Sequence, residues 1–319
     1  MDLFVNELSV HGQFPDPASF RGAFARLMAM RTVAGRFDRE VYCSRGLLSA
    51  QAVAGMTMPQ TMQHFPEAQR RSALSWMTRG GPFWDDIRHH GADDWLESRH
   101  EIVTDSAVGE AGYRSLHGLA SGLISVTPSD WDFSPVTVTW RRTDAGQEDR
   151  RTELQNWRAD TALEESLHNA PGPLGSWEDL RRVSILRCTG LTFADACFDP
   201  LAGMPFAKSA AERILVLLNI LDQRSRAFDE SGRRTSEGQR LYQDYFTGDN
   251  ALFSDSSDTE KRSFYNQLTF PHPTDIGETL LCTWHGKVRH MNLRLHYSWS
   301  ERVGEPVYIV YVGPKITRR

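Results

Sequence analysis

Residues 291–299 read MNLRLHYSW, and residues 307–312 read VYIVYV. In the first stretch apolar and polar side chains alternate, which is the pattern of a β-strand with one apolar and one polar face. The second stretch is continuously apolar, as in a strand that is covered on both faces. A polar turn at 301–306 separates them, so we expect an antiparallel pair of strands in this part of the chain.

The strongest helix signal lies upstream of these strands. The apolar face of this predicted helix consists of Ala210, Ile214, Leu217, Leu218 and Leu221. The residues between them are also largely apolar, which predicts a well-buried helix. Residues 229–261 are rich in Asp, Ser, Gly and Thr, and we expect a mobile loop or an interaction segment there. The sequence thus predicts a β-rich C-terminal domain, residues 201–319, with an antiparallel sheet and a buried helix.

The N-terminal part of the chain mixes strands and helices. We expect strands at 3–10, 123–127 and 136–142 and helices at 107–121 and following the Asp16-Pro17 cap. A further helix after Phe65-Pro66 should stop at Gly80-Gly81-Pro82, and Ser176 should cap another. The predicted class is therefore α+β, with a larger mixed domain over residues 1–200.

Composition excludes several classes of protein. The chain is 40% hydrophobic and 10% aromatic, enough to form a core, so global disorder is excluded. The apolar run at 214–221 is far shorter than the roughly 20 residues that span a bilayer. The first ten residues, MDLFVNELSV, do not resemble a secretion signal, and we expect a cytoplasmic protein without a membrane partner. The four scattered cysteines include no CxxC pair and should be buried and reduced.

Charge is concentrated at the C-terminal end. The last 38 residues carry seven basic and two acidic side chains, while the whole chain has a net charge of -5. The remaining residues therefore carry -10. A basic patch on an acidic protein attracts a polyanion such as RNA. Alternatively, the patch forms salt bridges within the chain or with a protein partner.

Histidines and cations cluster in the same segment. The candidate catalytic residues are His285, Lys287, Arg294, His296 and Lys315, and the candidate nucleic-acid-binding residues are Arg289, Arg318 and Arg319. Metal-independent RNA cleavage needs a base for the 2′-hydroxyl, cations for the phosphate and an acid for the leaving oxygen. Imidazoles can transfer these protons near neutral pH.

The C-terminal segment resembles the RelE/ParE-type toxin superfamily. The matching pieces are His285-Gly286-Lys287, LRLHYSW at 293–299 and YIVYVGPKI at 308–316. The resemblance covers roughly the last 40 residues. It implies an RNA-cleaving or ribosome-directed domain that needs no metal, in a bacterial toxin or anti-phage setting with a possible antitoxin. Lys287, Arg294 and Lys315 would then hold phosphate, with His285 or His296 as acid or base.

Other carboxylates and histidines have alternative interpretations. The stretch from Asp85 to Asp94 can be a surface loop or a set of metal ligands, and its relevant residues are Asp85, Asp86, His89, His90, Asp93 and Asp94. Glu7 and Asp105 have no evident partner and are interpreted as structural. The chain has no phosphate-binding loop and no dinucleotide fingerprint, and we expect neither a cofactor nor a metal. The alternative to a ribonuclease is a non-catalytic subunit that binds nucleic acid or a protein.

Overall fold

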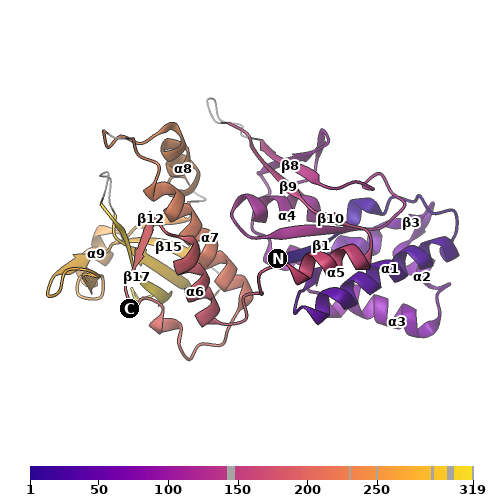
Figure 1. The fold of residues 1–319 in the computed structure, drawn as a ribbon, viewed down its shortest axis with the longest axis horizontal. Coiled ribbons are helices and arrows are strands. Elements are labelled where there is room, and N and C mark those ends of the chain that lie inside the picture. The colour runs from indigo at the N-terminus through magenta and orange to yellow at the C-terminus, as the bar shows by residue number, and fades with distance from the viewer. Residues whose placement is uncertain (142–147, 230, 249–250, 289–290, 300–304, 318–319) are drawn as a thin grey trace. The chain divides into compact units, whose positions relative to one another are not determined.

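The computed structural model describes residues 1–141, 148–229, 231–248, 251–288, 291–299 and 305–317. The chain forms two compact units, Met1–Pro173 and Leu174–Arg319, here called unit 1 and unit 2 (Figure 1). Each unit combines helices with strands. The predicted α+β class is therefore confirmed.

A four-stranded parallel sheet forms the centre of unit 1. Its strands, in order across the sheet, are β10, β7, β1 and β2. Their bounds, in the same order, are Asn156–Trp157, Ser121–Ser125, Asp2–Asn6 and Val41–Tyr42. β1 has a neighbour on each side and all its residues are buried, as expected for a strand covered on both faces. It ends at Asn6, so the strand is shorter than predicted.

Helices cover both faces of this sheet. On one face lie α1 (Pro17–Arg36) and α5 (Asp160–His168), which share a core with Leu3 and Val5 of β1. Successive strand residues point to opposite faces, and Phe4 accordingly belongs to the core on the other side.

The second face of the sheet carries α4 (Ala107–Leu116) and an antiparallel sheet of strand order β6-β5-β8-β9. The bounds of these strands are Glu101–Ile102, Trp95–Ser98, Val136–Arg141 and Arg150–Leu154. α4 approaches β8 closely, because a Cβ atom added to Gly112 would lie 2.5 Å from Cγ1 of Val138.

The remaining elements of unit 1 follow β2 along the chain. They are β3 (Gln51–Val53), β4 (Met56–Thr57), α2 (Met58–Met62) and α3 (Glu67–Ser75). α3 continues as a π-helical turn to Gly80. Gly81 then has a φ of 50°, a left-handed conformation that glycine adopts without strain. The predicted stop at this position is confirmed.

A five-stranded sheet forms the centre of unit 2, in the order β11-β17-β16-β15-β12. The bounds of these strands are Leu191–Phe193, Val307–Pro314, Leu293–Tyr297, Trp284–Val288 and Phe253–Asp255. β16 and β17 pair antiparallel, as predicted. β11 adds one parallel pairing at the edge, so the sheet is mixed.

The predicted buried helix is α7 (Lys208–Ser225), and it packs against one face of this sheet. α6 (Trp177–Arg187) packs against α7 and begins at the predicted cap, Ser176. α6 and β11 belong to unit 2, whereas the predicted boundary after residue 200 assigns them to the first domain. The break at 199–205 is a turn inside unit 2.

The polar segment 229–261 is more ordered than the sequence predicts. It contains α8 (Ser236–Phe246), β12 and the start of α9 (Asp258–Ser263). α8 buries Leu241, Tyr245 and Phe246, whose apolar contacts hold an otherwise polar helix in place. The expectation of a loop is wrong for these elements.

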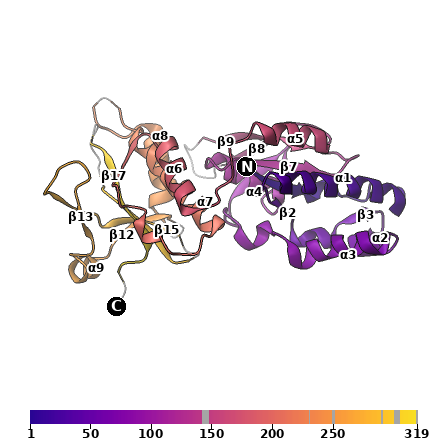
Figure 2. The ribbon, with the colours of Figure 1, turned by 60° about the horizontal axis from the view of Figure 1, so that its bottom comes forward.

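A separate two-stranded hairpin, β13 (Thr269–Pro271) with β14 (Thr279–Leu281), completes unit 2. Figure 2 shows β13 and α9 on the side of the main sheet that is remote from α7. Among the described residues, every helix of the chain is too short or too polar to cross a lipid bilayer.

Candidate functional site

The register of β15 and β16 brings four of the predicted site residues together. His285 lies opposite His296, and Lys287 lies opposite Arg294. Directly opposed residues of antiparallel strands point to the same face, so the four side chains share one side of the sheet. Tyr311 of β17 lies opposite His296 and joins them. We call the side that bears these five residues the polar face.

The other side of the same strands is apolar and faces α7. It carries Val288, Leu293 and Leu295, all of them buried. A Cβ atom added to Gly286 would lie 3.0 Å from Cδ1 of Leu217 in α7. The alternation seen in the sequence therefore separates a core face from the polar face, as predicted.

The two imidazoles of the polar face are close together and neutral. Their ring centroids are 5.4 Å apart. Burial lowers the pKa of His285 to about 4, and the nearby charges of Arg294 and Lys287 contribute to the decrease. Burial and the neighbouring His285 likewise lower the pKa of His296 to about 3. Both rings are thus neutral at neutral pH, each with a single ring proton.

Hydrogen bonds orient the two rings. The Nδ1 atom of His285 is 3.4 Å from the carbonyl oxygen of Thr283, and that of His296 is 3.2 Å from the carbonyl oxygen of Cys282. A carbonyl oxygen only accepts, so these partners assign the ring proton to Nδ1. Nε2 of His285 then keeps its lone pair, 3.4 Å from Oγ of Ser254.

Cations border the imidazoles. Lys287 and Arg294 are half-buried, and Nη1 of Arg294 donates to the carbonyl oxygen of Leu293 at 2.8 Å. Lys315, the fifth predicted catalytic residue, follows β17 and pairs with Glu260 of α9 at 3.3 Å. Arg289, Arg318 and Arg319 lie outside the described residues.

Three further residues of this site, Glu260, Ser254 and Tyr311, are not predicted by any pattern in the sequence. Burial opposes the ionisation of Glu260, but hydrogen bonds from Thr317, the Ser257 backbone and Lys315 outweigh it and lower its pKa. Its negative charge acts on both imidazoles, slightly raising their pKa values. The strand pattern contains Tyr311, but only pairing with β16 shows which face it takes. No sequence feature distinguishes Glu260 from the other carboxylates of its acidic segment.

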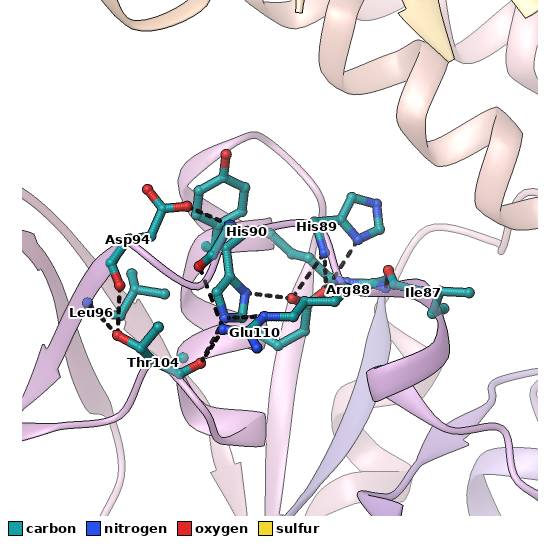
Figure 3. Close-up of polar contacts among 12 residues, drawn as sticks. Ile87, Arg88, His89, His90, Asp94, Leu96, Thr104 and Glu110 are labelled. Atoms are coloured by element: carbon teal, nitrogen blue, oxygen red, sulfur yellow. Dashed lines mark hydrogen bonds and ion pairs between the residues drawn. The ribbon is translucent and has the colours of Figure 1, made fainter. Parts of the chain in front are cut away.

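The candidate metal ligands at 85–94 do not converge on one site. His89 and His90 both place Nδ1 against Glu110, at 3.1 and 2.7 Å (Figure 3). Arg114 adds a third contact to this carboxylate through Nε at 2.6 Å. Burial opposes ionisation of Glu110, but the two histidines and Arg114 outweigh it and hold its pKa well below the usual range. This cluster is a buried ion network that ties α4 to the preceding loop.

The aspartates near these histidines point elsewhere. Asp85 accepts from the backbone of Arg45 at 2.7 Å, and Asp86 pairs with the Arg45 side chain. Asp94 accepts from the backbone of Gly91. In the part of the chain that the structure describes, no three metal-ligating side chains form a group that could hold an ion.

Glu7 and Asp105, which the sequence leaves without partners, do have them. Asp105 pairs with Arg88 at 2.9 Å. Glu7 follows β1, and its carboxylate oxygens lie 3.1 and 3.2 Å from the backbone nitrogen of Ala107, the first residue of α4. Burial raises the pKa of Glu7 to about 7, although the hydrogen bonds from the backbone oppose the shift. A carboxyl group from another element thus caps the helix.

Comparison with known proteins finds no relative. No family model, no curated protein and no solved structure matches the chain.

Proposed function

We propose that unit 2 binds RNA on the polar face and cleaves it by metal-independent transesterification. The observation that carries this proposal is the register of β15 and β16, which sets two imidazoles beside two cations on one side of a sheet. Cations attract the phosphodiester backbone and stabilise charge on the reacting phosphate. The neutral imidazole of His285 next to them has an unprotonated Nε2 that can accept a proton from a hydroxyl group.

The residues of the polar face have distinct roles in this reaction. Nε2 of His285 takes the proton of a 2′-hydroxyl, and the 2′-oxygen forms a bond to phosphorus. The bond from phosphorus to the 5′-oxygen breaks, and that oxygen takes a proton from water. Arg294 and Lys287 stabilise the charge on the phosphate oxygens. The products are a 2′,3′-cyclic phosphate and a 5′-hydroxyl, and His285 returns its proton to solvent.

The low pKa of His285 makes the pH dependence of cleavage diagnostic. Because the pKa is about 4, the ring stays in its basic form throughout the range from pH 8 to pH 5. Cleavage should therefore lack the inflection near pH 6.5 that an ordinary histidine gives. A rate that falls tenfold between pH 7 and pH 6 would contradict a catalytic base with this lowered pKa.

Cleavage of an end-labelled single-stranded RNA by the full chain in EDTA tests the proposal. His285→Ala and Arg294→Ala should each lower the rate by about 100-fold, the order of a lost proton transfer or charge contact. Lys261→Ala is the matched control, because Lys261 of α9 pairs with Asp255 of β12 and is not on the polar face. A wild-type chain without cleavage, or variants with unchanged rates, would refute the ribonuclease.

A binding module is the second candidate, and the burial of His296 favours it. His296 is only 2% exposed, and neither imidazole is in the cationic form that could act as the acid at neutral pH. In this case the cations hold RNA or another polyanion without reaction. Binding would weaken steeply with salt, and removing Lys287 or Arg294 would reduce the salt slope by about one each. An RNA substrate is in keeping with the expected cytoplasmic location.

A further inference from the structure

His296 is buried although it lies on the polar face. Its neighbours His285, Lys287 and Arg294 on that face are all more exposed. The hairpin of β13 and β14, residues 269–281, provides the cover, and we call it the flap. The ring centroid of Phe270 in the flap lies 6.0 Å from that of His296 and 6.1 Å from that of Tyr311.

The flap is attached weakly to the rest of unit 2. It forms a sheet of its own, and each of its residues is half-buried or exposed. A backbone hydrogen bond from Cys282 to Leu268 closes its base at 2.8 Å. Further out, the ring of His272 lies 4.8 Å from that of Tyr308, and the hydroxyl groups of Thr274 and Tyr308 are 3.3 Å apart. An isolated two-stranded hairpin is marginally stable, and a segment with so little buried surface opens more easily than the core.

Aromatic rings line both sides of the contact between the flap and the polar face. Phe270 and His272 belong to the flap, whereas Tyr308 and Tyr311 belong to β17. The cations of the polar face lie on the next two strands of the sheet, Arg294 on β16 and Lys287 on β15. Rings on which bases stack, next to cations that follow the backbone, are the means by which proteins bind single-stranded nucleic acid. In a duplex the bases are already stacked inside and do not reach such rings.

We propose that the flap opens to admit single-stranded RNA and excludes the duplex. Unpaired bases then stack on Phe270 and Tyr311 while Arg294 and Lys287 contact the phosphates. The inference rests on the proposed RNA binding for its ligand, but the movement of the flap is independent of any ligand. When the flap is closed, His296 is shielded, and when it opens, His296 becomes part of the accessible polar face.

Chemical modification of His296 tests the flap without RNA. Diethyl pyrocarbonate acylates accessible neutral imidazoles, and mass spectrometry measures the rate at each histidine. Phe270→Ala should increase the rate at His296 severalfold because it removes the covering ring. Ile276→Ala, at a fully exposed position of the flap, should leave the rate as in the wild type. Equal rates in all three proteins would contradict the proposal that the flap covers His296. Far-UV circular dichroism checks that Phe270→Ala remains folded.

Binding measurements test the choice of ligand. A fluorescent single-stranded RNA should bind the wild type at least about tenfold more tightly than the same strand annealed to its complement. Phe270→Ala should reduce this preference, whereas Ile276→Ala should not. Equal or tighter binding of the duplex would overturn the single-strand preference. If neither RNA binds, the proposed function fails, whereas the modification rate of His296 still decides whether the flap covers this residue.

Discussion

At the scale of single residues, Glu7 links the stability of unit 1 to pH. Its folded pKa of about 7 lies above the ordinary value of 4.5, so the folded protein holds a proton that the unfolded chain releases. The resulting stabilisation is complete below pH 4.5 and is lost as the pH rises through 7. Glu7→Gln keeps an oxygen for the amide of Ala107 but cannot ionise. We expect it to gain about 2 kcal/mol on the wild type between pH 5 and pH 8.

Urea unfolding of the two proteins at several pH values measures this difference. The curve of free energy against pH should be flatter for Glu7→Gln. Asp16→Asn is a control, since Asp16 caps α1 and its pKa is lowered rather than raised by the hydrogen bonds of the cap. Parallel curves for Glu7→Gln and the wild type would show that Glu7 ionises normally in the folded chain.

Tyr297 carries a buried hydroxyl group that weakens unit 2. Its side chain is fully buried, and among the described residues the hydroxyl has no hydrogen-bond partner. Tyr297→Phe removes a polar atom that has lost its hydration, so we expect the free energy of unfolding to rise by about 1 kcal/mol. Tyr311→Phe is the matched control, because the Tyr311 hydroxyl donates to the carbonyl oxygen of Pro314 at 2.7 Å. Thermal or urea unfolding should show opposite signs for the two variants.

The sequence predicts which side chains share the polar face, but not how buried they are. Alternation along a strand is a local property, and it places Arg294 and His296 on one side correctly. The burial of His296 depends on Phe270, which comes from a separate hairpin and meets it only in the folded unit. Glu260 was missed for the same reason, since its contact with Lys315 joins distant parts of the chain.

At the scale of secondary-structure elements, replacing two helix glycines by alanine should change the stability in opposite directions. A Cβ atom on Gly112 of α4 would lie 2.5 Å from Val138 of β8, whereas nothing lies within 4 Å of such an atom on Gly22 of α1. Gly112→Ala should therefore lower the free energy of unfolding by about 1–3 kcal/mol through overpacking. Gly22→Ala should raise it by about 1 kcal/mol, because alanine favours the helix.

Urea unfolding of both variants checks these signs. The midpoint should fall for Gly112→Ala and rise for Gly22→Ala. If Gly112→Ala were as stable as the wild type, α4 and β8 would have room to separate, and the close contact would not be a constraint on the fold.

Elements that begin at a local capping residue are predicted from the sequence, whereas elements that depend on contacts between distant parts of the chain are not. Asp16 and Ser176 cap α1 and α6 because their side chains accept hydrogen bonds from nearby backbone amides. α8 was missed because its few apolar residues lie within a polar segment and become meaningful only through packing. The parallel pairing of β1 with β2 and β7 joins segments far apart in the sequence, and no local pattern specifies it.

At the scale of the whole molecule, the position of the boundary between the units is testable. We expect fragments 1–173 and 174–319 to fold separately, because each contains its own sheet and the helices that cover it. Fragment 201–319 lacks α6 and β11, leaving α7 and the edge of β17 exposed, and should aggregate or unfold. Circular dichroism and size-exclusion chromatography distinguish these outcomes. A cooperatively folded fragment 201–319 would instead favour the boundary predicted from the sequence.

The sequence predicts the boundary after residue 200, whereas the two compact units meet at 173/174, and the chain has a similar break near each position. The segments at 169–176 and 199–205 are both rich in Pro and Gly, and composition alone does not rank them. The pairing of β11 with β17 favours the earlier break, and no local sequence pattern specifies that pairing.

The four cysteines of the chain, Cys43, Cys188, Cys197 and Cys282, are all buried. Burial raises the pKa of each thiol to about 12. Because alkylating reagents react with the thiolate, the native protein offers them almost no target. The variant Ile276→Cys would therefore take up a maleimide dye selectively, with every native cysteine left in place. The emission of that dye would report the movement of the flap in real time.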